Sequence, residues 1–199
     1  MADNVAITPG SGATVAADDI SSVLYQRVKI SHGADGSATD TSTASPLPTR
    51  TVWATLTAAP TVTAGAYSAS DAIGALMTFT DAVRATGGHA KIHTLTFTEL
   101  GITANVINLW LFSDSIAAIA DNAAFDPSDA EMFTCVGVIP LVAADYLIAT
   151  DNQAITMENV GLVYNCTGTS LYGQFEAVGT PTFAGTADVK VRMQVEYLD

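Results

Sequence analysis

The segment Ile92–Asp114, IHTLTFTELGITANVINLWLFSD, carries the clearest structural signal of the chain. In its first half Leu95 and Phe97 alternate with threonines, and this period of two predicts a half-buried strand. The second half, Val106–Phe112, ends in Leu-Trp-Leu-Phe, which is apolar on both faces and too short to span a membrane. The break between them, with its Gly and Asn, predicts a short turn. We therefore expect two strands, the second in the middle of a packed sheet.

The sequence on either side of this stretch predicts more strands. Asp71–Thr80 fits a strand or a helix equally well, because short apolar runs do not distinguish the two. Asp126, followed by Pro127, predicts a short helix capped by Asp126. The further strand candidates are Val52–Leu56, Pro60–Thr63, Phe133–Leu141, Tyr146–Ala149, Ile155–Met157, Gly161–Asn165, Ser170–Val178 and the strictly alternating Asp188–Leu198. Short strands at this spacing indicate an all-β sandwich or jelly roll.

Both tryptophans are expected in the core of this domain. Trp53 is the first large apolar residue of the regular part, and Trp110 is flanked by the apolar residues Leu109, Leu111 and Phe112. Aromatic residues of β-domains belong to the core more often than to a ligand platform. We therefore predict that Trp110 is a core anchor and not a sugar-stacking surface.

The charge of the chain limits the classes of partner that it can bind. Seven Lys and Arg stand against 20 Asp and Glu, a formal net charge of −13, and no Lys or Arg occurs between Lys91 and Lys190. A surface this acidic repels DNA, RNA and anionic lipid, so neither nucleic acid nor membrane is an expected partner. The two cysteines, Cys135 and Cys166, are too few for a disulfide framework and are expected to be buried free thiols, although a cross-strand pair stays open.

Residues 1–50 differ from residues 51–199 in composition. They are rich in Gly, Ser, Thr, Ala and Asp, and their one strong apolar run is Val23–Ile30. Such a segment has too little apolar surface to offset its own ordering entropy. We expect an extended N-terminal arm with a linker at Ala34–Pro48, followed by one β-sandwich domain; a simple disordered terminus is the alternative. The arm residues expected to bind a partner are Val23, Leu24, Tyr25, Arg27, Val28 and Ile30.

No motif for catalysis, a cofactor or a metal stands out. His89 and His93 are four residues apart in a predicted strand, about 13 Å, which is too far for one ion. A loose calcium site at Asp121, Asp126, Asp129 and Glu131 is the weaker alternative to helix capping. No nucleophile elbow or phosphate loop is present, so we expect no enzyme and no cofactor. The start, Met-Ala-Asp-Asn, lacks the basic and apolar regions of a secretory signal, which predicts synthesis in the cytoplasm.

Several segments resemble virion structural proteins of tailed bacteriophages. The N-terminal leader is the most specific of them, and it recurs on different particle components. The matching segments are Met1–Asp19, Tyr25–Lys29, Gly33–Gly36, Thr61–Gly74, Ala120–Asp129, Val138–Pro140, Gly168–Gly173 and Gly179–Phe183.

The resemblance implies a non-enzymatic protein of the virion that is assembled in the host cytoplasm. Its most specific form is a head decoration (cement) protein whose arm lies along the major capsid protein, with a homo-oligomer, most commonly a trimer, as the expected state. A tail or baseplate component is the main alternative. A glycan-binding adhesion module of the particle, and behind it a depolymerase, come from a different class.

Overall fold

A computed structural model describes residues 17–20, 23–26, 31–32, 39–40 and 52–198. The chain divides into two compact units, Met1–Arg50 and Thr51–Asp199, and each is described by itself. In the first unit, β1 (Ala17–Ile20) pairs antiparallel with β2 (Val23–Gln26), and β3 (Ser31–His32) pairs with β4 (Thr39–Asp40). A single two-stranded ribbon is marginally stable in water, so these ribbons need support from other contacts.

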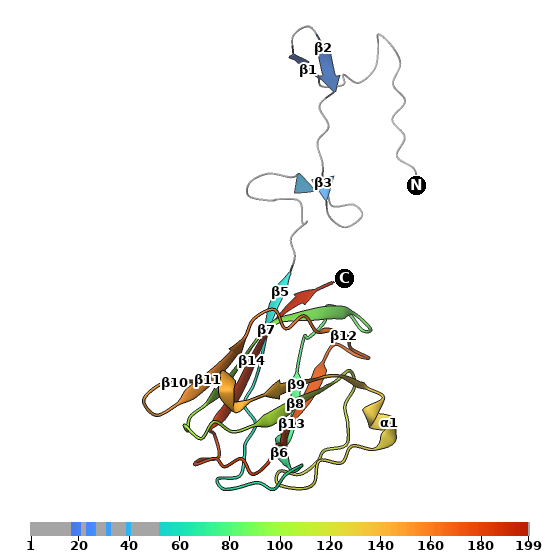
Figure 1. The fold of residues 1–199 in the computed structure, drawn as a ribbon. Helices are drawn as coiled ribbons and strands as arrows, with labels where there is room; N and C mark the ends of the chain where they lie inside the picture. Colours follow the sequence, from blue (N-terminus) through green and yellow to red (C-terminus); the bar gives the residue numbers. More distant parts are fainter. Residues whose placement is uncertain (1–16, 21–22, 27–30, 33–38, 41–51, 199) are drawn as a thin grey trace. The chain divides into compact units, whose positions relative to one another are not determined.

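The second unit consists of two antiparallel sheets (Figure 1). The six-stranded sheet runs in the order β10 (Leu147–Ile148), β11 (Gln153–Met157), β7 (His89–Glu99), β14 (Val189–Tyr197) and β5 (Trp53–Ala58), with β12 (Val163–Asn165) also paired to β7. The four-stranded sheet runs in the order β6 (Ala72–Phe79), β13 (Leu171–Ala177), β8 (Ile107–Phe112) and β9 (Cys135–Leu141). Two short helical turns lie between strands: α1 (Asp129–Met132) between β8 and β9, and η1 (Ala143–Asp145) between β9 and β10.

The eight longest strands pair in a nested order. The first pairs with the last, β5 with β14, and the pairing continues inward as β6 with β13, β7 with β11 and β8 with β9. Eight antiparallel strands rolled in this way into two sheets form a jelly roll. The predicted all-β sandwich of jelly-roll type is therefore confirmed.

The core lies between the two sheets. Phe97 of β7 meets Phe175 of β13 edge to face, with ring centroids 5.4 Å apart, so one aromatic pair spans the two layers. Leu95 and Val191 from one sheet and Leu109 and Leu111 from the other are fully buried. The alternation in β14 places Val189, Val191, Met193 and Val195 inside and the residues between them on the other face, as a half-buried strand requires.

The strands predicted in Ile92–Asp114 are present, but they belong to opposite sheets. β7 crosses the six-stranded sheet and β8 lies between β13 and β9 in the four-stranded sheet, with residues 100–106 connecting them. The expected central position of β8 is confirmed. Asp71–Thr80 is resolved as strand, whereas Pro60–Thr63 lies outside every strand. Pro60 instead packs against Gly74, where an added Cβ would lie 2.7 Å from the Pro60 ring, and Gly74 has a φ of +69°.

The predicted cap of the short helix was wrong by two residues. Ser128, not Asp126, caps α1: its side chain accepts from the Glu131 amide, and the Glu131 carboxylate accepts from the Ser128 amide at 2.8 Å. This is a capping box, whose Ser-x-x-Glu spacing is visible in the sequence. Glu131 also accepts from the amide of Ala117, so the helix cap ties down the preceding loop. These hydrogen bonds lower the pKa of Glu131, with that from Ala117 contributing most.

Candidate interaction surfaces

The arm residues predicted to bind a partner fall at the boundary of what the structure describes. Val23, Leu24 and Tyr25 lie in β2, while Arg27, Val28 and Ile30 lie outside the described residues. The expected single strand is therefore a hairpin over its first part, because β2 pairs with β1. In the described part of the chain the other edge of β2 has no paired strand. A partner-binding role of the arm stays a prediction.

The outer face of the four-stranded sheet is covered by residues 113–126, called here the covering segment. The side chain of Gln174 points outward from β13 yet is 0% exposed, because its amide donates to the carbonyl oxygens of Gly74 and Ile119 at 3.0 and 3.1 Å. Asp121 accepts hydrogen bonds from the Thr63 hydroxyl, the Tyr67 hydroxyl and the Gly74 amide at 2.6, 2.7 and 2.6 Å. The covering segment is thus held to the domain by partly buried hydrogen bonds.

Trp110 lies under this covering segment and not in the central core, so its prediction was wrong in part. It is half-buried, its ring packs against Phe125 with centroids 5.4 Å apart, and its indole N–H donates to Glu176 at 2.7 Å. Asn108 donates to the same Glu176 oxygen at 3.0 Å. The polar neighbour comes from the adjacent strand β13, which the local sequence around Trp110 could not reveal.

The outer face of the six-stranded sheet is uncovered among the described residues and is rich in threonine. Cross-strand register aligns Thr156 of β11, Thr96 of β7, Arg192 of β14 and Thr57 of β5 in one row. These side chains are exposed or half-exposed, and a shallow hollow of about 170 Å³ lies over them. The hollow is lined by Thr94, Thr96, Thr156, Glu158, Arg192 and Gln194. We call this surface the threonine face.

Trp53 lies at one end of the threonine face and is 52% exposed, so its expected place in the core was wrong. The cause is its position on edge strand β5, opposite Glu196, where alternation directs it outward while Leu56 points inward. Its ring meets that of His93 with centroids 4.4 Å apart and a tilt of 57°. His93 in turn contacts the Glu196 carboxylate at 2.5 Å.

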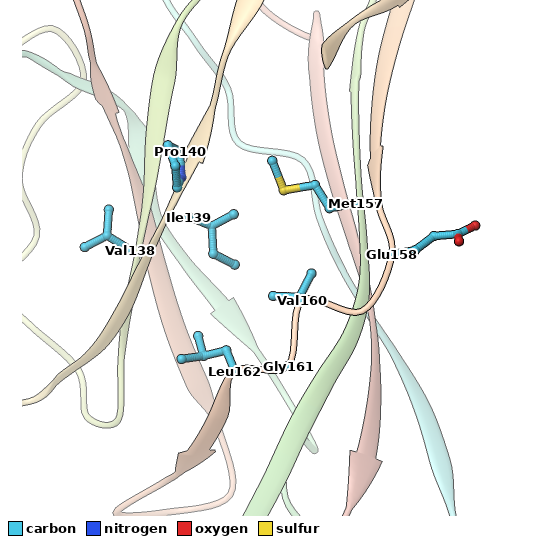
Figure 2. A pocket seen from close by; sticks show the side chains of 8 residues that line it. All are labelled: Val138, Ile139, Pro140, Met157, Glu158, Val160, Gly161 and Leu162. Atoms are coloured by element: carbon cyan, nitrogen blue, oxygen red, sulfur yellow. The ribbon is translucent and has the colours of Figure 1, made fainter. Parts of the chain in front are cut away.

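A second, apolar groove of about 510 Å³ separates the edges of the two sheets (Figure 2). Ile139 of β9 and Met157 of β11 face each other across it, and Val160 and Leu162 form its floor, while Glu158 points away. Leu162 approaches β9 so closely that a Cβ added to Gly137 would lie 2.9 Å from it. The groove runs beside the edge of β9 that has no paired strand among the described residues.

A buried polar network closes one end of the sandwich. Glu99, only 1% exposed, accepts from Thr103, Asn105 and Gln153 at 2.5, 2.6 and 2.9 Å. The Asn105 side chain also makes two hydrogen bonds with the backbone of Thr182: it accepts from the N–H and donates to the carbonyl oxygen, each at 2.9 Å. Burial, followed by the charge of Glu99, raises the pKa of the Tyr146 hydroxyl well above its usual range. The fully paired carboxylate makes this a structural network.

The cysteines are free, as predicted. Cys166 is buried and Cys135 is half-buried. Burial raises the pKa of the Cys166 thiol to about 11 and also raises that of Cys135, so neither thiol is activated as a nucleophile.

The histidine and acidic positions weighed for metals do not come together. His89 and His93 lie apart on β7, and Asp121 is occupied by protein donors. Within the described residues no group of three or more His, Cys, Asp or Glu side chains could hold a metal ion. No helix in the described ranges is long and apolar enough to cross a membrane.

Comparisons with known proteins add only a distant structural likeness to these observations. No protein-family model matches the chain, and no curated protein sequence matches it. Among solved structures, a chain described as Desmodium yellow mottle tymovirus is similar over 87% of this chain and 95% of its own length, with 12% sequence identity and a TM-score of 0.27. A likeness at that score carries no argument about function, which has to come from the chain itself.

Proposed function

We propose that this protein is a non-enzymatic structural component of a virion, and specifically a decoration protein on the outer surface of a phage head. In this proposal the N-terminal arm binds the major capsid protein and the jelly-roll domain, as part of a homo-oligomer, projects from the shell. Assembly takes place in the host cytoplasm. A trimer is the oligomeric state we favour.

The observation that carries the proposal is the nested eight-strand pairing, taken together with the leader-like N-terminal sequence. Jelly rolls are used by viral coat proteins, lectins and cupins. A cupin-type reaction chamber is not supported, because the space between the sheets is filled with side chains such as Phe97 and Phe175, and the buried polar residues that the structure describes are Glu99, Asn105, Gln153 and Gln174. The fold alone does not distinguish a coat protein from a lectin. The resemblance of the N-terminal leader to phage virion proteins is what favours a component of a virus particle.

The arm fits a shell-binding role by its composition. It contributes three of the seven Lys and Arg residues, Arg27, Lys29 and Arg50, whereas the body has a long stretch without any. An extended segment with an apolar run can add a strand to the edge of a partner sheet, where main-chain hydrogen bonds give affinity. The acidic body, in contrast, is repelled by packaged DNA.

The experiment compares the full-length chain with a fragment starting at Thr51 on purified heads that lack the protein. The full-length chain should coat the heads without other virion components and raise the temperature at which they rupture, because a ligand selective for the intact shell stabilises it. The fragment should fold and fail to bind. A fragment that coats heads as well as the whole chain would contradict the role of the arm, and binding to tails instead of heads would assign the protein to a tail or baseplate.

A further inference from the structure

The distribution of positive charge in the jelly-roll domain is strongly uneven. Of the four Lys and Arg residues that the structure describes, Lys91, Lys190 and Arg192 all extend from the threonine face, and Arg84 lies elsewhere. Within the described part of the chain, Lys190 and Arg192 have no hydrogen-bond or ion-pair partner. In a chain with a net charge of −13, three cations gathered on one sheet face are not explained by internal ion pairing.

The polar groups near these cations are threonine hydroxyls and the Gln194 amide, with the Glu158 carboxylate also lining the hollow. The Thr94 hydroxyl donates to the Gln194 side-chain oxygen at 3.3 Å, which leaves the Gln194 N–H groups available. Arg192 lies between Thr96 of β7 and Thr57 of β5, and Thr156 of β11 lies beyond Thr96. Gln194 lies two residues after Arg192 on β14, on the same face of the sheet. Four strands at a spacing of about 4.8 Å place this row over about 14 Å. The row is wide enough for several units of an extended polymer, and the hollow of about 170 Å³ lies on it.

An aromatic platform completes the surface. Trp53 lies opposite Glu196, four residues from Arg192 along β14, a separation of about 13 Å. Its ring is half-exposed and held at one side by His93. An exposed indole beside hydroxyl and amide donors suits the apolar face of a sugar ring, and a guanidinium suits a carboxylate.

We propose that the threonine face is a binding site for an extended acidic polysaccharide, a glycan that carries carboxylates. Arg192 and Lys190 pair with its carboxylates, and the threonines and Gln194 bind its hydroxyls. Trp53 stacks on a sugar ring that lies about 13 Å from the row along the strand direction. The site gives the protein an adhesive function that is separate from attachment through the arm. Charge complementarity favours the acidic class, because the three cations of this face, Lys91, Lys190 and Arg192, outnumber its two carboxylates, Glu158 and Glu196.

The two tryptophans supply a direct assay. Full-length protein is titrated with alginate oligosaccharides, which are polyuronates, while tryptophan emission is recorded. We expect saturable binding with a change in emission that disappears in Trp53→Phe and persists in Trp110→Phe. Neutral dextran of matched length should bind at least tenfold more weakly. Raising the salt concentration should weaken binding, since the cations are exposed.

Substitutions separate the site from general charge attraction. Arg192→Ala should weaken alginate binding at least tenfold and Lys190→Ala severalfold, whereas Arg84→Gln, which also removes one charge, should stay within twofold of the unaltered chain. Circular dichroism verifies that each variant is folded. The proposal is overturned if alginate and hyaluronan both fail to bind, if dextran binds equally well, if Arg84→Gln matches Arg192→Ala, or if a short single-stranded DNA binds while the polyuronates do not.

Discussion

The two sheets of the jelly roll treat their outer faces in opposite ways. On the four-stranded sheet, the covering segment buries Gln174 completely and half-buries Trp110, which donates to Glu176. On the six-stranded sheet, the outward residues of β7, β14 and β5 remain accessible, and Trp53 is 52% exposed. One outer face of the fold thus contributes to stability, and the other is available for contact with a partner. The six-stranded sheet is therefore the face to test for binding, because Lys190 and Arg192 have no internal partner there among the described residues.

The strongest test of this difference compares the two tryptophans. We expect Trp110→Ala to lower the free energy of unfolding by about 2–4 kcal/mol, because it removes packing against Phe125 and leaves the Glu176 carboxylate without its indole donor. Trp53→Ala should cost about 1 kcal/mol or less, since about half of the residue is exposed to solvent. Urea unfolding of both variants gives the answer. Equal losses would remove the distinction between the two faces.

The attachment of the covering segment depends on Asp121. Asp121→Ala leaves the Thr63 hydroxyl, the Tyr67 hydroxyl and the Gly74 amide without their acceptor, and we expect a loss of about 1–3 kcal/mol. Asp126→Ala, a matched acidic change in an exposed position, should stay within about 0.5 kcal/mol. Chemical unfolding with and without calcium measures both. A calcium-dependent loss at Asp126 would favour the metal alternative over protein hydrogen bonding.

Alkaline pH should loosen the same attachment more gradually. Burial, followed by the hydrogen bond to Asp121, raises the pKa of Tyr67 to about 12 from an ordinary value of 10.0. Because the folded state holds this proton more tightly, its contribution to stability is complete below pH 10 and is lost as the pH rises toward 12. Unfolding free energies measured between pH 9 and 12, values chosen to bracket the pKa of about 10 of a free tyrosine, should fall less steeply for Tyr67→Phe. An unchanged slope would contradict this role of Tyr67.

Sequence reasoning predicted the sandwich because alternation records which side of a strand faces the core. Val189–Tyr197 and the run around Leu95 and Phe97 carry that signal directly, and the structure confirms both strands. Alternation does not indicate which sheet a strand joins, so the sequence predicted two strands joined by a short turn but not that β7 and β8 lie in opposite layers. Nested pairing is a long-range property that local pattern cannot supply.

The tryptophans show why the candidate surface could not be predicted. Burial of an outward side chain depends on whether a distant segment covers it, and the covering segment reaches Trp110 but not Trp53. The threonine face was visible only as Thr-x-Thr alternation at Thr94, Thr96 and Thr98, a pattern equally typical of any solvated strand. Only the cross-strand register of Thr96 with Arg192 identifies this surface as a candidate site.

We propose that the arm attaches the protein to a particle while the threonine face stays free. The chain has three lysines, Lys29 in the arm and Lys91 and Lys190 on the threonine face, which makes lysine labelling followed by mass spectrometry the most direct measurement. Labelling is compared between free protein and particle-bound protein. We expect Lys29 to lose reactivity on the particle and Lys91 and Lys190 to keep theirs. Protection of Lys91 and Lys190 with an unchanged Lys29 would contradict it, because the threonine face would then be the attachment surface.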